Sequence, residues 1–251
     1  ASNAWAAAPS RKRKSMALIK PPRLLPGDTI GLVTPAGQVS REAIDKAIAN
    51  TQALGFQVKL GRHLEEVNGN YAGPWQHRLD DLHGMFTDPD VKAIWAIRGG
   101  SGAMQLLPHL DYGLIRRHPK ILVGYSDITA LHLAIHRHAG LVTFHGPVGM
   151  STLSPYSTEH LLAVLMRPED EYTIPMALEN SRRAELEPHY ALRTVVAGTA
   201  TGRLTGGNLA LVSALAGTQY AADIRGALLF LEEVNEEPYR VDRMLMQLNL
   251  N

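Results

Sequence analysis

The sequence predicts an α/β fold in which a parallel sheet is covered by helices, and two observations support this class. From Asp28 onward, apolar runs of strand length alternate with stretches of helical spacing, which is typical of parallel sheets with crossover helices. The expected strands end in glycine, proline or a small polar residue, at the edge where open α/β sheets bind ligands. We therefore expect functional residues at the strand ends.

The individual elements follow from this pattern in chain order. Residues 29–33 are expected to form the first strand, which ends in the turn Pro35-Ala36-Gly37. Ser40 then caps a helix whose apolar positions recur near one face, and Gly55 ends that helix. The later strands are expected at residues 57–60, 93–97, 121–123 and 141–144, with a helix at residues 75–86.

The chain divides where this pattern breaks down, between Met166 and Thr194. We interpret residues 26–166 as an N-terminal domain, 167–194 as a linker and 195–251 as the start of a smaller α/β domain. In that domain we expect a run at 195–204, a turn at 206–208, a helix at 209–215, a strand at 227–231 and a helix at 239–248. It is shorter than the roughly 70–80 residues at which a single core sustains itself, so we expect it to be truncated here.

The first 25 residues differ in composition from the rest of the chain. Alanine dominates residues 1–8, four basic residues follow at 11–14, and Pro21-Pro22 comes next. Because the chain opens with Ala1, we interpret residues 1–25 as an unfolded leader, which is a processed export signal, an expression remnant or the result of truncation.

Composition excludes several classes of function. The chain has a formal net charge of +1 and no cysteine. So small a charge argues against a nucleic-acid partner, and the lack of cysteine excludes disulfides, thiolate zinc sites and a cysteine nucleophile. The longest apolar runs, such as residues 227–231, fall far short of the roughly 18 residues that cross a bilayer. We therefore expect a small-molecule partner and no membrane span.

Residues 120–130 read K-I-L-V-G-Y-S-D-I-T-A, which predicts a strand, a tight turn and a helix. Ser126 on the turn resembles a nucleophile elbow, in which the bend lifts the hydroxyl clear of the sheet. The following helix then offers N–H groups to a developing oxyanion. The second glycine of G-x-S-x-G is missing, and a serine before an aspartate is often a helix N-cap. On this stretch by itself, both interpretations stay open.

A glycine-rich loop, Arg98-Gly99-Gly100-Ser101-Gly102, follows another expected strand. Small residues let the backbone approach a ligand closely. Three interpretations stay open: an oxyanion N–H donor, a phosphate cradle and a plain strand-to-helix turn. The G-G-S-G spacing matches neither G-x-G-x-x-G nor a Walker A loop, which weakens the nucleotide interpretation.

Two adjacent acids, Glu232 and Glu233, close the apolar strand at 227–231. Alternation along a strand places neighbouring side chains on opposite faces, so one acid can point to a site while the other meets solvent or a basic group. Acids at strand ends are common, so the pair does not by itself establish a catalytic role.

The histidines give one weak metal pattern and one site candidate. His132 and His136 have the spacing of a two-ligand metal site, but Leu133 stands where the metalloprotease pattern has glutamate. We interpret them, with His138, as an exposed polar face. His145, in T-F-H-G-P at the end of a strand, is the internal histidine positioned like a site residue.

Five ordered segments carry a resemblance to a known family. They are R-G-G-S-G at 98–102, G-Y-S-D at 124–127, F-H-G-P at 144–147, L-T-G-G-N-L at 204–209 and F-L-E-E-V-N-E-E-P-Y-R-V-D-R-M-L at 230–245. Together they resemble the LD-carboxypeptidase (muramoyltetrapeptide carboxypeptidase) family of serine peptidases, which is related to the microcin C immunity hydrolases. The run Y-A-G-P-W-Q-H-R-L-D-D-L at 71–82 also resembles that family, and the resemblance covers residues 26–251.

The resemblance implies a Ser–Glu–His triad in which Ser126 is the nucleophile and Glu232 is the acid. It implies an oxyanion hole from the backbone N–H groups of Gly100 and Asp127, substrate contact by Asn208, and neither a metal nor a cofactor. The family histidine lies in a glycine-histidine motif downstream of the R-M-L segment, so no residue of this chain receives that role.

By the same resemblance, the expected reaction is acyl transfer: cleavage of the L,D peptide bond of murein tetrapeptides, with release of terminal D-alanine in cell-wall recycling. Family members are typically cytoplasmic homodimers, although the leader is also consistent with export to the periplasm. Two alternatives stay open: a microcin C immunity-type hydrolase of peptidyl or aminoacyl nucleotides, and a muropeptide-binding module without a base. Without the histidine, the chain alone is expected to be inactive.

Overall fold

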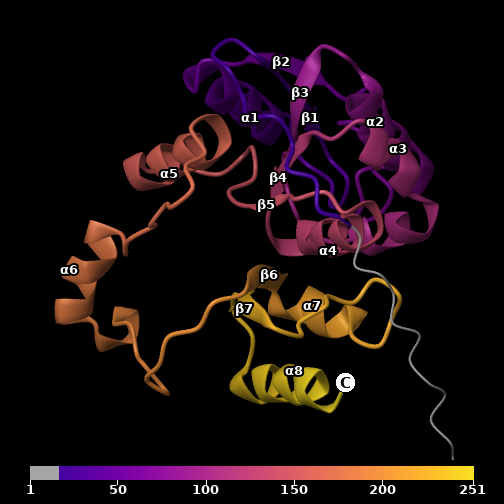
Figure 1. Ribbon diagram of the computed structural model, residues 1–251. Helices are drawn as coiled ribbons and strands as arrows, with labels where there is room; N and C mark the ends of the chain where they lie inside the picture. The colour runs from indigo at the N-terminus through magenta and orange to yellow at the C-terminus, as the bar shows by residue number, and fades with distance from the viewer. Residues whose placement is uncertain (1–16) are drawn as a thin grey trace, which may run out of the picture.

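A computed structural model describes residues 17–251, which form a five-stranded parallel sheet covered by helices and a smaller α/β unit beside it (Figure 1). The predicted α/β class is confirmed. The larger unit contains β1 (Thr29–Val33), α1 (Arg41–Ala53), β2 (Gln57–Leu60), α2 (Trp75–Thr87), β3 (Val91–Ala96), η1 (Ala103–His109), α3 (Tyr112–Arg117), β4 (Ile121–Gly124), η2 (Ser126–Ile128), α4 (Thr129–Ala139), β5 (Phe144–His145) and α5 (Pro155–Met166). Then follow α6 (Leu178–Leu186), η3 (Pro188–Tyr190), β6 (Arg203–Asn208), α7 (Leu209–Leu215), β7 (Ala227–Glu232) and α8 (Pro238–Leu250).

The sheet has the strand order β2-β1-β3-β4-β5, and all neighbouring strands are parallel. From β1 the chain adds β2 on one side and later β3, β4 and β5 on the other, so the strand order reverses between β1 and β3. Ligands of open α/β sheets bind at such a switch point, outside the carboxyl ends of the strands. The loops that follow β1, β3 and β4 meet at this edge.

Alternate residues of the central strands supply two separate apolar cores. Ile94 of β3 and Leu122 of β4 pack with α2, α3 and α4, whereas Trp95 and Val123 pack with α1 and α5. Figure 1 shows α2 and α3 on one side of the sheet and α5 on the other. Burial on both faces explains why these strands read as continuous apolar runs in the sequence.

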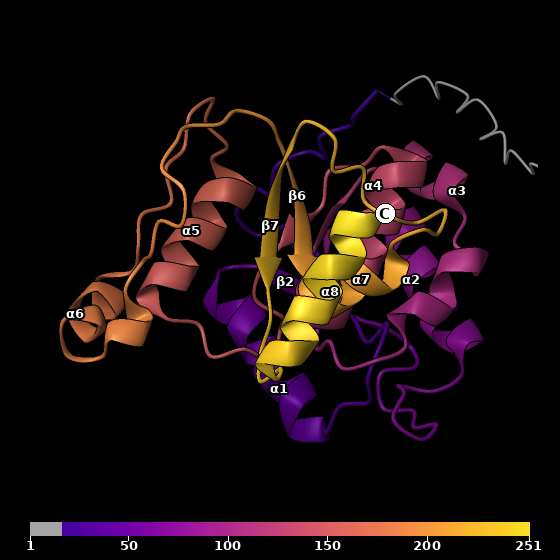
Figure 2. The ribbon, with the colours of Figure 1, turned by 90° about the horizontal axis from the view of Figure 1, so that it is seen from below.

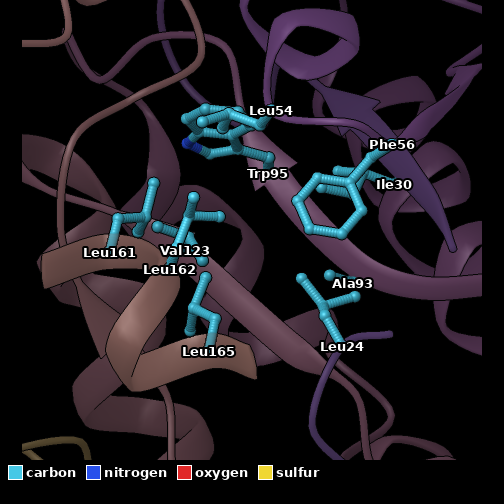
Figure 3. A pocket seen from close by; sticks show the side chains of 10 residues that line it. All are labelled: Leu24, Ile30, Leu54, Phe56, Ala93, Trp95, Val123, Leu161, Leu162 and Leu165. Carbon is cyan, nitrogen blue, oxygen red and sulfur yellow. The ribbon is translucent and has the colours of Figure 1, made fainter. Parts of the chain in front are cut away.

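The core beneath α5 encloses a small cavity of about 10 Å³ (Figure 3). Its walls are formed by the apolar side chains of Leu24, Ile30, Leu54, Phe56, Ala93, Trp95, Val123, Leu161, Leu162 and Leu165. A buried water needs about this much space and also two to four polar partners. We therefore interpret the cavity as a packing defect.

The segment that leads into β1 packs on the larger unit, although it belongs to the expected leader at residues 1–25. Ile19 forms a parallel bridge with Leu141, and Leu24 is buried beneath α5, where its N–H donates to Leu165 O at 2.9 Å. The larger unit therefore includes residues that the expected boundary assigned to the leader. The alanine-rich and basic stretches of that leader lie outside the described residues.

The smaller unit consists of β6, α7, β7 and α8, with β6 and β7 side by side and parallel (Figure 2). The turn expected at 206–208 is wrong, because these residues are the last three of β6. Gly206 and Gly207 have φ values of 128° and 130°, and a Cβ on Gly206 would lie 1.8 Å from Phe230 O. The two glycines permit close approach of backbones rather than a reversal of the chain.

Two further expectations differ from the structure. The fifth strand contains only Phe144 and His145 instead of residues 141–144, because Leu141 pairs with Ile19 and not with β4. The segment at 167–194, expected as a linker, contains α6 and η3, and none of the α6 side chains is buried.

Within residues 17–251, no helix combines the length and apolarity needed to cross a bilayer.

The two-sided core predicts a large effect for Leu122→Ala. Leu122 is 0% exposed, so its truncation should lower the free energy of unfolding by about 2–5 kcal/mol. The matched control is Leu60→Ala on the edge strand β2, where Leu60 is 42% exposed and the expected change is within about 0.5 kcal/mol. Urea denaturation followed by circular dichroism measures both, and equal losses would contradict the described burial.

Candidate active site

Ser126 lies in a sharp turn between β4 and α4. β4 is buried along its whole length, and the short helix η2 leads from Ser126 into α4. The φ of Ser126 is 61°, a left-handed conformation that costs roughly 1–3 kcal/mol in a residue other than glycine. Its side chain is partly exposed, whereas the next two residues are buried. A strained, accessible serine between a parallel strand and a helix has the geometry of a nucleophile elbow.

Gly99, in the loop after β3, lies directly against Ser126. A Cβ on Gly99 would come within 3.0 Å of Ser126 Oγ and 3.2 Å of Asp127 N. A larger residue at this position would therefore press on the serine and on the N–H group that follows it. The structure thus brings the predicted nucleophile, the predicted donor Asp127 and the glycine-rich loop together at one strand edge.

Gly100, the other predicted oxyanion donor, packs against the turn after β1. Its φ is 98°, and a Cβ on it would lie 3.1 Å from Gly37 Cα. Gly37 N in turn donates to Gly99 O at 2.9 Å. Sequence reasoning found this loop but missed Gly99 as the residue that contacts the serine, because nothing in two consecutive glycines distinguishes them. Gly100 as an oxyanion donor stays a prediction.

The side chain of Asp127 ties the elbow to the glycine-rich loop. Its Oδ2 accepts a hydrogen bond from Ala103 N at 2.7 Å, at the point where the loop enters η1. Burial raises the pKa of Asp127, while the Ala103 N–H and the positive charge of Arg78 act in the opposite direction. The Asp127 carboxyl group therefore holds the loop at the start of η1, while the backbone N–H of Asp127 lies beside Ser126.

Arg78 of α2 supports the same loops from the other side. It is 2% exposed, and its guanidinium donates to the carbonyl groups of Pro35 at 3.1 Å and Gly102 at 3.0 Å. Burial lowers the pKa of Arg78, and the charge of Asp127 opposes this shift. Sequence reasoning missed Arg78, although its position four residues before the apolar Leu82 places it on the same face of the helix and was a signal for burial.

Glu232 ends β7 and pairs in register with Asn208 of β6. Its Oε1 is buried without a hydrogen-bond partner among residues 17–251 and lies 3.8 Å from His145 Nε2. Burial raises the pKa of Glu232, and the adjacent Glu233 adds to this rise, whereas burial lowers the pKa of His145. Burial thus disfavours the charged form of each group, and the unpartnered Glu232 Oε1 can accept another hydrogen bond.

Glu233 directly follows β7 and accepts hydrogen bonds at the start of α7. Its two carboxylate oxygens accept from Asn208 Nδ2 at 3.1 Å and from Ala210 N at 3.0 Å. Asn208 Oδ1 accepts from Leu211 N at 3.3 Å, so both ends of this amide are bonded within the protein. The asparagine predicted to contact substrate therefore also has a structural role as the N-cap of α7.

The end of β6 contacts the helix that follows the elbow. Asn208 N donates to Thr129 Oγ1 at 3.0 Å, and a Cβ on Gly207 would lie 2.7 Å from the same oxygen. Because Glu232 pairs with Asn208, this contact brings the acid toward the region of Ser126. Sequence reasoning missed Thr129, which lies only three residues after the serine.

The expected exposure of His132 is wrong. The residue is 7% exposed, and its Nε2 lies 2.9 Å from Gly124 O, at the end of β4. Burial lowers the pKa of His132 to about 4, so its neutral ring donates to that carbonyl. The expectation failed because α4 is covered by the sheet and also by α7, which the sequence pattern does not show.

His145 lies among aromatic rings. The centroid of its ring is 6.2 Å from that of Tyr125 and 5.3 Å from that of Phe230.

A cleft of about 730 Å³ opens beside His132 and His145. It lies between β5, α5 and β6, and its walls include His145, Gly206 and Phe230. Clefts of this size, with mostly apolar walls and a few polar groups, are typical of small-ligand sites.

Both units of the chain match a known protein family. Residues 30–146 match the LD-carboxypeptidase N-terminal domain, and residues 201–251 match the LD-carboxypeptidase C-terminal domain. A probable murein peptide carboxypeptidase of Bacillus subtilis is 43% identical over 236 residues, which cover 92% of this chain and 70% of the relative.

Solved structures of related proteins are also similar to this chain. An MccF-like protein from Bacillus anthracis has a TM-score of 0.78 at 32% identity, over 93% of this chain and 76% of that one. A muramoyltetrapeptide carboxypeptidase from Oxalobacter formigenes has a TM-score of 0.75 at 29% identity, over 88% of this chain and 71% of that one. On both the sequence and the structural matches, the chain belongs to the LD-carboxypeptidase family.

Proposed function

We propose that this protein is a serine-type LD-carboxypeptidase that cleaves the L,D peptide bond of murein tetrapeptides and releases terminal D-alanine. The observation that carries the proposal is Ser126, held at a φ of 61° with its Oγ against Gly99 and beside the N–H of Asp127. The names of the relatives, a murein peptide carboxypeptidase and a muramoyltetrapeptide carboxypeptidase, support the substrate class.

In the proposed reaction, Ser126 Oγ attacks the carbonyl carbon of the scissile bond and its proton passes to a histidine base. The N–H groups of Asp127 and Gly100 stabilise the oxyanion, and the base then gives the proton to the amine of the departing D-alanine. Water, activated by the same base, attacks the acyl-enzyme and frees Ser126. Each step transfers one proton through the base and needs no metal or cofactor.

We assign Glu232 the task of orienting this histidine and stabilising its charged form. The buried, unpartnered Oε1 of Glu232 supports the assignment, since a carboxylate in that role accepts a hydrogen bond from imidazole. As the family resemblance implies, we place the base in a glycine-histidine motif outside residues 1–251. His145, 3.8 Å from Glu232, is the internal competitor.

A hydrolase of the microcin immunity type is the second candidate. The similarity to the MccF-like structure favours it, at 32% identity and a TM-score of 0.78. Both candidates use the same serine chemistry, so substrate choice separates them: release of D-alanine from a murein tetrapeptide against cleavage of an aminoacyl nucleotide analogue. Homodimerisation and a cytoplasmic location stay predictions from the family resemblance.

Ser126→Ala should abolish D-alanine release in the active enzyme, with a loss of roughly 10⁴ to 10⁶ in turnover, because the nucleophile is removed. Mass spectrometry of a murein tetrapeptide digest measures the product, and circular dichroism checks the fold. Ser181→Ala on α6, away from the site, is the matched control and should keep full turnover. Retained turnover in Ser126→Ala would remove this serine from the mechanism.

Glu232→Gln should lower kcat by about 10³ to 10⁴, because an amide cannot stabilise the charged imidazole. Glu233→Gln should have only a mild effect, since its amide oxygen can still accept one of the hydrogen bonds at the start of α7. Steady-state kinetics on both variants, after a check that their melting temperatures are similar, decides between the acids. The reverse ranking would assign the catalytic role to Glu233.

Residues 1–251 alone should release no D-alanine, whereas the same chain extended through the codons that follow Asn251 in its gene should be active. The physical reason is that a serine without its base stays a neutral hydroxyl. Within residues 17–251, the side-chain hydrogen bonds of His63, His77, His83, His132 and His160 go to partners other than Ser126. If residues 1–251 turn over tetrapeptide and His145→Ala stops them, His145 is the base.

A further inference from the structure

Three metal-ligating side chains gather outside the proposed active site, between the β2–α2 loop and the first turn of α2. His63 and Glu66 come from the loop, and His77 comes from α2. Each offers one ligand atom, and these atoms lie within 4.8 Å of one another. The three side chains are partly exposed, so an ion from solvent can reach them. Their spacing in the sequence, H-x₂-E-x₁₀-H, matches none of the zinc motifs considered in the sequence analysis, which expected no metal site.

His63 is held in place by a buried carboxylate. Asp81 of α2 is 5% exposed, and its Oδ1 lies 2.9 Å from His63 Nδ1. The same carboxylate accepts from Arg62 N at 2.9 Å and His63 N at 3.0 Å. A carboxylate on one ring nitrogen fixes the tautomer and leaves the other nitrogen with a free lone pair, as in carboxylate–histidine–zinc arrangements.

Glu66 and His77 are also brought together by the backbone. His77 Nδ1 lies 2.7 Å from Glu66 Oε2, and the rings of His63 and His77 stack with centroids 4.4 Å apart. Gly73 makes room for this approach, because a Cβ on it would lie 2.5 Å from Glu66 Oε2. The two imidazoles and the carboxylate therefore lie side by side, and the stacked rings would turn about their side-chain bonds to direct their nitrogens at one ion.

We propose that His63, Glu66 and His77 form a zinc-binding site, with Asp81 as the positioning residue for His63. Two imidazoles and one carboxylate are an established donor set for Zn²⁺, and a water completes a tetrahedron. Imidazole ligands argue against Ca²⁺ and Mg²⁺, which prefer oxygen.

The bound ion would fasten the β2–α2 loop to α2 next to the network that supports the elbow. Arg78, which donates to Gly102 O, directly follows His77 in the chain. Tyr71 belongs to the same loop, and the centroid of its ring lies 5.3 Å from Arg78 Cζ. A Cβ on Gly102 would lie 2.7 Å from the Tyr71 ring. The proposed role is therefore structural, and binding does not require the proposed catalysis.

Isothermal titration of the metal-stripped chain with ZnCl₂ tests the site. We expect one ion per chain with a dissociation constant on the order of 1 μM or tighter. Zinc at 100 times this concentration should raise Tm by about 5–10 °C. His77→Ala and Glu66→Gln should each weaken binding at least tenfold and remove most of the Tm shift. Co²⁺ substituted for Zn²⁺ should give the strong visible absorption of a four-coordinate ion.

His189→Ala is the matched control, because His189 also faces a glutamate, with 3.5 Å between its Nε2 and Glu187 Oε2, but among residues 17–251 no third ligand joins this pair. It should leave zinc affinity unchanged. If His77→Ala does not fold, Glu66→Gln carries the test, since that side chain is 37% exposed. Zinc binding that is absent, or that His189→Ala weakens as much as Glu66→Gln does, would overturn the proposal.

Discussion

The arrangement of the site depends on one buried cation. A parallel sheet delivers the loops after β1, β3 and β4 to the same edge, but it does not determine how closely they approach. Arg78 does this by donating to the carbonyl groups of Pro35 and Gly102, while Asp127 accepts from the N–H of Ala103. Removing the Arg78 side chain would leave these carbonyl groups without this donor, and an unsatisfied buried polar group costs about 1–3 kcal/mol. We regard this network as the support of the strained serine, because such a conformation persists only where its surroundings determine it fully.

The sequence predicted well the features that depend on local chemistry. Alternating apolar runs predicted the sheet, Ser40 and Gly55 marked the limits of α1, and the serine between a strand and a helix predicted the elbow. Strand alternation predicts that Glu232 and Glu233 face apart, and the two acids have different neighbours: Glu232 lies 3.8 Å from His145, whereas Glu233 accepts from Ala210 N. In each of these cases the signal lies within a few residues of the feature.

Features that depend on contacts between distant segments were beyond the sequence. Gly206 and Gly207 have the composition of a turn, yet they lie in β6 because Phe230 and Thr129 come so close to their backbone. His132 reads as a polar helix position, but α7, about 80 residues later in the chain, covers the helix that carries it. The converging ligands His63 and His77 likewise belong to different elements, and only the fold brings them together.

The proposed nucleophile and the proposed acid belong to different units of the structure. Ser126 lies in the larger unit and Glu232 in the smaller one, and the Thr129–Asn208 hydrogen bond is part of the junction between them. Accurate docking of the two units is therefore a condition of the proposed reaction, because a shift of about 1 Å between reacting groups can reduce turnover roughly a hundredfold. In an enzyme built in this way, separation of the two units stops turnover even while each unit stays folded. Turnover therefore reports on the contact between the units as well as on the chemistry.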